Sequence, residues 1–150
     1  MTASDASRDL VVHAARAAAD KKGFDLVALD VSEHLYLTDV FLLVAARNER
    51  QVGSIVDAVD DALHRQGVKT LRREGEQTKR WVLLDYGDLV VHVQHEEERA
   101  YYALDRLWRD CPLVELPADV AESAAANAQE GEDEAPTYVP APLREVAGGR

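Results

Sequence analysis

The chain of 150 residues has one cysteine, few aromatic residues and no long hydrophobic run. Cys111 cannot form an internal disulfide by itself, which is typical of a reducing compartment. No window approaches the roughly 20 consecutive apolar residues that a membrane-spanning helix requires. The first residues lack the basic and apolar regions of a secretion signal. These absences predict a cytoplasmic protein without a membrane partner.

Signatures of enzyme chemistry are also missing. We find no Ser-His-Asp arrangement, activated Cys-His pair, glycine-rich phosphate loop or zinc knuckle. His92, His95 and Glu96 carry groups that bind zinc, but they lack a well-spaced third ligand, so structural histidines are the better interpretation. Asp85 and Asp88 could serve two-metal nucleotidyl transfer, although aspartates that form a turn are commoner. We predict no enzyme activity, cofactor or metal, with a metal-dependent nucleotidyltransferase as the alternative.

The charge of the chain narrows the class of partner. The formal net charge is -11, from 28 acidic and 17 basic residues. Such a molecule repels phosphate backbones and anionic membranes as a whole. A basic run between Arg65 and Arg80 is interspersed with acids and is interpreted as a solvated face or a small phosphate contact. The excess of acidic residues predicts a basic protein surface as partner and little direct nucleic-acid binding.

Hydrophobic periodicity predicts two helices in the first half of the chain. Apolar residues recur at helical spacing over 10–18 and 52–63, and Gly23 and Gly67 follow where such helices end. Asn48 is a good N-cap for the second helix. Short apolar runs at 24–31 and 40–46 predict buried strands, and 68–73 predicts a short strand.

Residues 80–108 predict an antiparallel hairpin that leads directly into a helix. Strand-forming residues flank the turn Tyr86-Gly87-Asp88. Three glutamates from Glu96 complement the positive end of a helix dipole, and Tyr101, Leu104 and Trp108 are expected on the inner face of that helix. The order of elements predicts an α/β fold with a mixed sheet of about five strands flanked by helices, rather than a doubly wound parallel sheet.

The composition changes after Pro117. Residues 118–150 hold seven acidic and two basic residues and no Ile, Phe or Trp. This is too little apolar surface to offset the entropy of ordering a chain. We predict a folded domain at 1–117 and a disordered acidic tail at 118–150, whose removal should leave folding intact.

Several segments of the chain form a recognisable set of motifs. They are 80–88 (Arg-Trp-Val-Leu-Leu-Asp-Tyr-Gly-Asp), Val90–Val93, Glu96–Arg99, Tyr102 and Leu107-Trp108, and upstream Asp25–Ser32, Thr38–Phe41, Asn48–Val52 and Arg73–Gly75. Together these segments resemble the ribosomal silencing factors, the Iojap-related family. The resemblance covers about residues 8–114, and Val40, Ala46-Arg47, Gln94 and Ala100 depart from the family pattern.

This resemblance implies a fold similar to nucleotidyltransferases without their catalytic residues. It also implies binding to the large ribosomal subunit through the large-subunit ribosomal protein conventionally numbered fourteen. The bound factor would block joining of the small subunit and repress translation. An assembly chaperone that does not silence ribosomes is an alternative, and a homodimer is compatible with a domain of this size.

The expected contact face combines the hairpin turn with the head of the following helix, where polar groups are rigidly held and exposed. Loss of its charges should weaken binding and leave folding intact. The expected contact residues are Tyr86, Asp88, Glu96, Glu97, Arg99 and Tyr102, with Thr38 and Asp39 as outer candidates.

Overall fold

A mixed five-stranded sheet forms the centre of the protein in a computed structural model, which describes residues 2–130. The strand order is β1-β2-β5-β4-β3, and the β2–β5 pair is parallel while the other neighbouring pairs are antiparallel. The helices are α1 Asp5–Asp20, α2 Glu49–Arg65, α3 Glu96–Tyr102, α4 Leu104–Leu107 and α5 Ala118–Glu130, and the strands are β1 Phe24–Asp30, β2 Val40–Ala46, β3 Arg72–Glu74, β4 Trp81–Asp85 and β5 Leu89–His95. The predicted mixed α/β sheet is confirmed.

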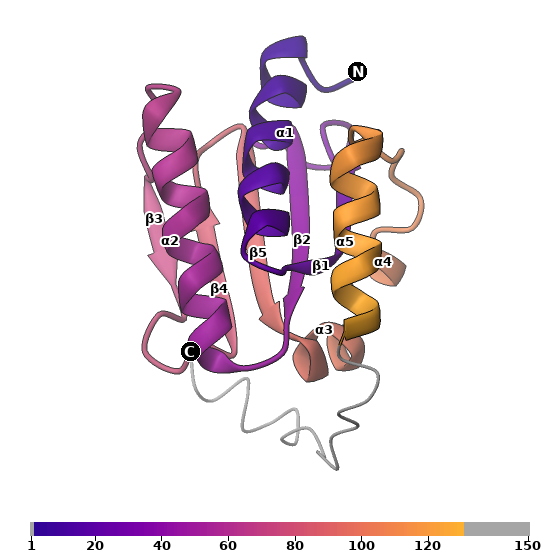
Figure 1. Cartoon of the computed structure of the whole chain (residues 1–150). Coiled ribbons are helices and arrows are strands. Elements are labelled where there is room, and N and C mark those ends of the chain that lie inside the picture. Colours follow the sequence, from indigo (N-terminus) through magenta and orange to yellow (C-terminus); the bar gives the residue numbers. More distant parts are fainter. Residues whose placement is uncertain (1, 131–150) are drawn as a thin grey trace.

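The two faces of the sheet differ in their cover. Helices α1, α2 and α5 lie side by side over one face (Figure 1) and enclose the larger hydrophobic core. The apolar stripe predicted for 52–63 supplies its buried residues in α2, and Asn48 is the N-cap as expected. The other face packs a smaller cluster around Leu29, Phe41 and Leu43 against α4 and Cys111. This second face is therefore the thinner side of the molecule.

The chain between α2 and β4 differs from expectation. A strand was predicted over 68–73, but the ladder with β4 contains Arg72–Glu74. The backbone N–H of Val68 donates to the carbonyl of Leu63 instead and closes the last turn of α2. Val68 therefore belongs to the helix terminus, and the strand begins four residues later.

The single helix expected from Glu96 to Trp108 is divided at Ala103, whose φ of 47° is left-handed. Because of this break, Leu104 and Trp108 turn toward the second face of the sheet, while Tyr101 becomes exposed rather than facing inward. No glycine or proline marks the position, so local sequence signals gave no indication of the break.

The tail is ordered further than expected, so the disorder predicted from residue 118 is wrong for 118–130. Helix α5 packs on α1 and β1. Its buried residues Val120, Ala124 and Asn127 share one helical face and meet the small buried alanines of α1. The Asn127 amide donates to the carbonyls of Ala19 and Gly23, at 3.0 and 2.9 Å, where α1 ends. The remainder of the predicted tail, 131–150, lies outside the described residues.

Candidate functional site

The expected contact residues lie at opposite ends of β5. Tyr86 and Asp88 precede the strand, whereas Glu96 and Glu97 follow it. A strand of seven residues spans about 20 Å. Thr38 and Asp39 join the first group, because β2 runs parallel to β5 and both strands start at the same edge. The hairpin turn and the head of α3 therefore do not form one face, and that expectation is wrong.

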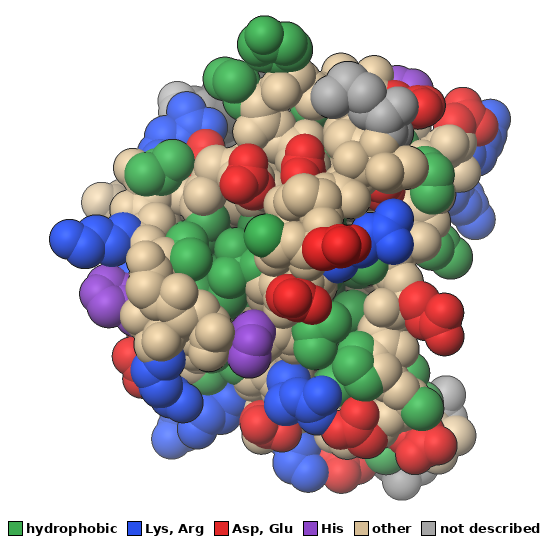
Figure 2. All heavy atoms as spheres, turned by 90° about the horizontal axis from the view of Figure 1, so that it is seen from above, with side chains coloured by type: hydrophobic (Ala, Val, Ile, Leu, Met, Phe, Trp, Pro, Cys, Tyr) green, Lys and Arg blue, Asp and Glu red, His purple; other side chains and the backbone are tan. Residues whose placement is uncertain are grey.

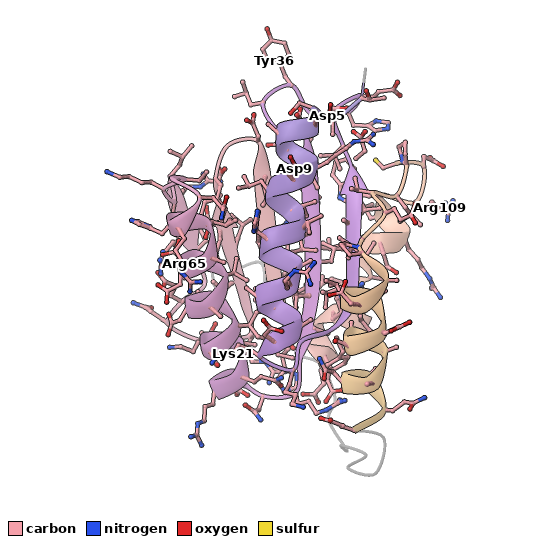
Figure 3. All side chains as sticks on the ribbon, turned by 45° about the horizontal axis from the view of Figure 1, so that its top comes forward. Asp5, Asp9, Lys21, Tyr36, Arg65 and Arg109 are labelled. Carbon is pink, nitrogen blue, oxygen red and sulfur yellow. The ribbon has the colours of Figure 1, made fainter. Side chains whose placement is uncertain are left out.

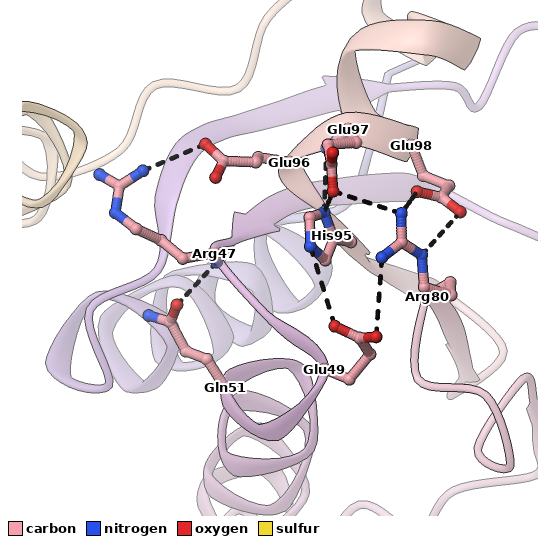
Figure 4. A network of polar contacts seen from close by, with 8 residues as sticks. All are labelled: Arg47, Glu49, Gln51, Arg80, His95, Glu96, Glu97 and Glu98. Atoms are coloured by element: carbon pink, nitrogen blue, oxygen red, sulfur yellow. Dashed lines mark hydrogen bonds and ion pairs between the residues drawn. The ribbon is translucent and has the colours of Figure 1, made fainter. Parts of the chain in front are cut away.

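At the α3 end, the glutamates are engaged within the protein (Figure 4). Glu96 pairs with Arg47 at 3.1 Å. Glu97 lies 2.9 Å from Nδ1 of His95, and Arg80 reaches the carboxylates of Glu97 and Glu98 at 3.4 and 2.6 Å. These carboxylates already have cationic partners inside the domain, so they connect α3 to β4 and α2 rather than presenting free acceptors.

Burial alters the proton affinities of this network. It raises the pKa of Glu97, and the neighbouring Glu98 and Glu96 act in the same direction against the lowering effect of Arg80. Burial lowers the pKa of His95, as does the charge of Arg80. A lysine at position 97 would place a second cation beside Arg80. We therefore expect charge reversal at Glu97 to disturb folding, contrary to the expectation from sequence.

Two further expected contact residues are buried. Tyr86 is 6% exposed, and its hydroxyl donates to Oδ1 of Asp60 at 2.8 Å. Burial raises the pKa of Tyr86, and the carboxylate of Asp60 adds to the effect. Arg99 is 7% exposed and donates to Asp105 at 2.8 Å and to the carbonyl of Asp25 at 3.2 Å. Neither side chain is available as a surface anchor.

The opposite end of the sheet, here called the turn end, combines exposed apolar residues with carboxylates. Tyr36, Leu37 and Leu71 are 100%, 78% and 71% exposed. The Asp88 carbonyl accepts the N–H groups of Asp39 and Val40, so the backbone is fixed while the Asp88 carboxylate stays exposed. Figure 2 looks down on this end and shows acidic and hydrophobic side chains near its middle, with lysine, arginine and histidine side chains among and around them.

Asp39 has a structural role at this end. Its Oδ2 accepts from the backbone N–H of Ser4 at 3.2 Å and from the hydroxyl of Ser7 at 2.9 Å. These bonds tie the start of α1 to the start of β2, beside the N-cap that Ser4 provides. Thr38 is half-buried next to it. Asp88 is therefore the freest carboxylate among the expected contact residues.

A second exposed area follows β4 on the thin face of the sheet. Trp81, Leu83 and Asp85 alternate with buried residues and remain half-exposed, and Trp81 and Leu83 lie at the border of the smaller hydrophobic cluster. The ring of Tyr102 lies 5.1 Å from that of Trp81. We call Trp81, Leu83, Asp85 and Tyr102 the β4 surface. It continues to the turn end, since Asp85 Oδ1 accepts the N–H of Gly87 at 2.8 Å.

Sequence reasoning missed parts of this arrangement. Leu83 is not among the contact residues expected from the sequence, although its spacing from Trp81 and Asp85 places all three on one face of β4. The roles of Arg47 and Arg80 had no local signal, because their partners lie on other elements. Arg47 also donates to the carbonyls of Asn127 and Ala128 at the end of α5.

The metal-binding alternatives considered for the sequence can be compared with residues 2–130 of the structure. No group of three or more His, Cys, Asp or Glu side chains in this range is placed to hold a metal ion. The carboxylate of Asp85 accepts a hydrogen bond within the turn, as predicted for an aspartate that forms a turn. No helix in the described part of the chain is long and apolar enough to cross a membrane.

The structure is that of a small α/β domain whose mixed sheet is covered by helices on one face and keeps half-exposed aromatic side chains on the other. Comparison with known proteins gives the family. Residues 4–139 match the model described as "Ribosomal silencing factor during starvation", and the chain belongs to that family. A relative named Ribosomal silencing factor RsfS, from Halalkalibacterium halodurans, is 42% identical over 110 residues, covering 73% of this chain and 94% of the relative.

Other relatives and solved structures agree. The chloroplastic protein Iojap of Zea mays is 32% identical over 108 residues, which cover 72% of this chain and 47% of that protein. A crystal structure from Bacillus halodurans has a TM-score of 0.64 at 42% identity, covering 72% of this chain and 98% of the other. One from Chromobacterium violaceum has the same TM-score at 34% identity, covering 67% and 83%. The family resemblance found in the sequence is confirmed.

Proposed function

We propose that this protein binds the large ribosomal subunit in the cytoplasm and prevents the small subunit from joining, and so represses translation. The names of the relatives support a silencing factor. The proposed partner is the large-subunit ribosomal protein numbered fourteen, as the family resemblance implies. The mechanism is steric, because a bound domain of this size at the subunit interface occupies space that the small subunit needs.

The single observation that carries the proposed contact is the β4 surface. Interface hot spots are enriched in tryptophan and tyrosine that a partner can desolvate. The half-exposed Trp81 and its neighbour Tyr102 have this character, and Leu83 extends the apolar area. Asp88 and Thr38 at the turn end would flank the contact, and the -11 charge of the chain would favour encounter with a basic surface.

The test is sedimentation of the protein with purified large subunits, followed by addition of small subunits. The variant Leu83→Arg places a cation in the centre of the proposed contact. Wild type should migrate with the large subunit and reduce the amount of joined ribosomes, and Leu83→Arg should do neither. Its matched control is Leu113→Arg, since Leu113 is 73% exposed and lies beside β1 at the opposite edge of the sheet.

Both variants must show wild-type circular dichroism and cooperative melting before they are compared. If Leu83→Arg is folded and still prevents joining as wild type does, the β4 surface is not the contact. If wild type binds the large subunit without reducing joining, the assembly-chaperone alternative is favoured over silencing.

A further inference from the structure

A groove on the helical side of the turn end lies outside the β4 surface and shares only Asp88 with the contact proposed above. It lies between the first half of α1 and the connection that follows α2, and Asp88 closes it from the β4–β5 turn. Its volume is about 520 Å³. Figure 3 shows Asp9 on the part of α1 that borders it. The lining residues are Ala6, Ser7, Asp9, Leu10, Val12, His13, Gln66, Val68 and Asp88.

The groove is lined by two carboxylates and by no lysine or arginine of the described residues. Asp9 and Asp88 are exposed, and among residues 2–130 neither belongs to an ion pair. Two carboxylates from different elements therefore face solvent without an internal cation, in contrast to the paired glutamates of α3.

The groove also contains apolar surface beside its two carboxylates. Leu10, Val12 and Val68 are half-buried and line the groove, and Leu10 and Val68 also pack against the larger hydrophobic core. Lysine and arginine side chains bury an aliphatic stem along apolar surface and keep the charged end at a polar group. We propose that the groove binds a lysine- or arginine-bearing extended segment of a protein partner, with the stems on Leu10 and Val68 and the charged ends at Asp9 and Asp88.

The groove is preformed for this occupant. Asp9 is fixed by helix α1, and the backbone of Asp88 is fixed by the N–H groups of Asp39 and Val40. A backbone held in this way limits the positions that each carboxylate can take, so less conformational entropy is lost when a cation binds. Nucleic acid is excluded as occupant, since its phosphates would be repelled by the two carboxylates.

A nuclear magnetic resonance titration tests the inference without ribosomes, so its outcome is independent of the proposed function. The probe is the capped peptide Gly-Arg-Gly-Arg-Gly, and Gly-Glu-Gly-Glu-Gly is its negative control. Amide shifts should concentrate at Leu10, His13 and Val68 with the arginine peptide. The double variant Asp9→Asn with Asp88→Asn should weaken binding about fivefold, the range expected for loss of two exposed ion pairs.

The matched control is Asp57→Asn with Asp61→Asn, which removes the same charge from exposed positions of α2. It should change the affinity less than about twofold, because exposed charges beyond the contact are screened by solvent and salt. Equal weakening by the two double variants, or shifts spread over the acids of α5, would show general charge attraction and overturn the inference. Amide spectra of each variant without peptide report whether it is folded.

Discussion

At the residue scale, polar side chains of this protein are held by networks that join distant segments. Asp60 of α2 accepts from the hydroxyls of Tyr86 and Thr70 and pairs with Arg73. Burial alone would raise the pKa of Asp60, but the bonds from Thr70 and Tyr86 and the charge of Arg73 outweigh it, so the pKa is lowered. The Tyr86 hydroxyl therefore stabilises the fold rather than binding a partner.

The substitution Tyr86→Phe should lower the free energy of unfolding by about 1–2 kcal/mol, because it removes a hydrogen bond to a charged group. Urea unfolding at pH 7 measures this loss. Binding to the large subunit should remain at the wild-type level in the folded variant. A clear loss of binding at unchanged stability would restore Tyr86 as a contact residue.

His92 predicts a pH dependence of stability. Burial, together with the charge of Arg99, lowers its pKa to about 4, whereas an unfolded histidine titrates near 6.5. Between these values the unfolded chain takes up a proton that the folded chain does not. The free energy of unfolding is therefore not reduced by this histidine above about pH 6.5. It decreases as the pH falls toward about 4, by up to about 1.4 kcal/mol per pH unit.

The variant His92→Asn keeps an acceptor for the indole N–H of Trp81, which donates to Nδ1 of His92 at 3.1 Å. Its melting temperature should depend less steeply on pH between 6.5 and 4.5 than that of wild type. Some slope should remain, since the pKa of His95 is lowered too. Exposed His13 provides the control His13→Asn, and an identical slope in wild type and His92→Asn would refute the explanation.

At the scale of elements, α5 completes the covered face of the sheet. Its buried face contacts α1 and β1, and Asn127 caps carbonyls at the end of α1. Ion pairs of Arg16 with Asp119 and of Lys22 with Glu130 lie on its exposed side. These surface pairs are screened by water and contribute little, so the attachment of α5 depends on the buried residues.

A chain of residues 1–117 should unfold at lower urea than a chain of residues 1–130, with a loss of roughly 2 kcal/mol or more from the burial of Val120 and the bonds of Asn127. In the full chain, Asn127→Ala should reproduce part of this loss, whereas Gln129→Ala, at an exposed position, should not. Equal midpoints for the two shortened chains would mean that α5 is dispensable and that the domain ends at Pro117.

At the scale of the whole molecule, charge and shape divide the surface into different regions. Asp9 and Asp88 at the turn end are exposed, whereas Lys21, Arg50 and Lys79 line a separate groove along α2 together with Asp57 and Asp61. The protein thus combines a net charge of -11 with a local basic area. Salt dependence can show which of the two meets the ribosome.

Affinity for the large subunit should fall as salt rises from 50 to 300 mM, because attraction between exposed charges is screened over about 10 Å at 0.1 M. The variant Asp88→Asn should flatten this dependence, as it removes a carboxylate from the proposed contact. If Lys21→Gln with Arg50→Gln flattened it instead, the protein would contact ribosomal RNA phosphates. Equilibrium sedimentation at several salt concentrations distinguishes the two outcomes.

The sequence by itself determined the class of fold, the family and the positions of most elements. The fold class and the elements follow from local patterns, namely the apolar period of α2, the cap at Asn48 and the hairpin around Gly87. The family follows from the resemblance that residues 80–108 and the upstream segments carry. The sequence also has an excess of acidic residues, which favours a basic partner. Such properties depend on neighbours in the chain, so they can be read without coordinates.

The tertiary structure alone decided which polar residues are free. Arg80 and Arg47 neutralise the glutamates of α3 from other strands and loops, and Asp60 buries the hydroxyl of Tyr86 from α2. The same is true of α5, whose alanine-rich face is stable because α1 and β1 cover it. Burial and ion pairing join residues that lie far apart in the chain. Composition and residue spacing describe only neighbours in the sequence, so they do not predict these partners.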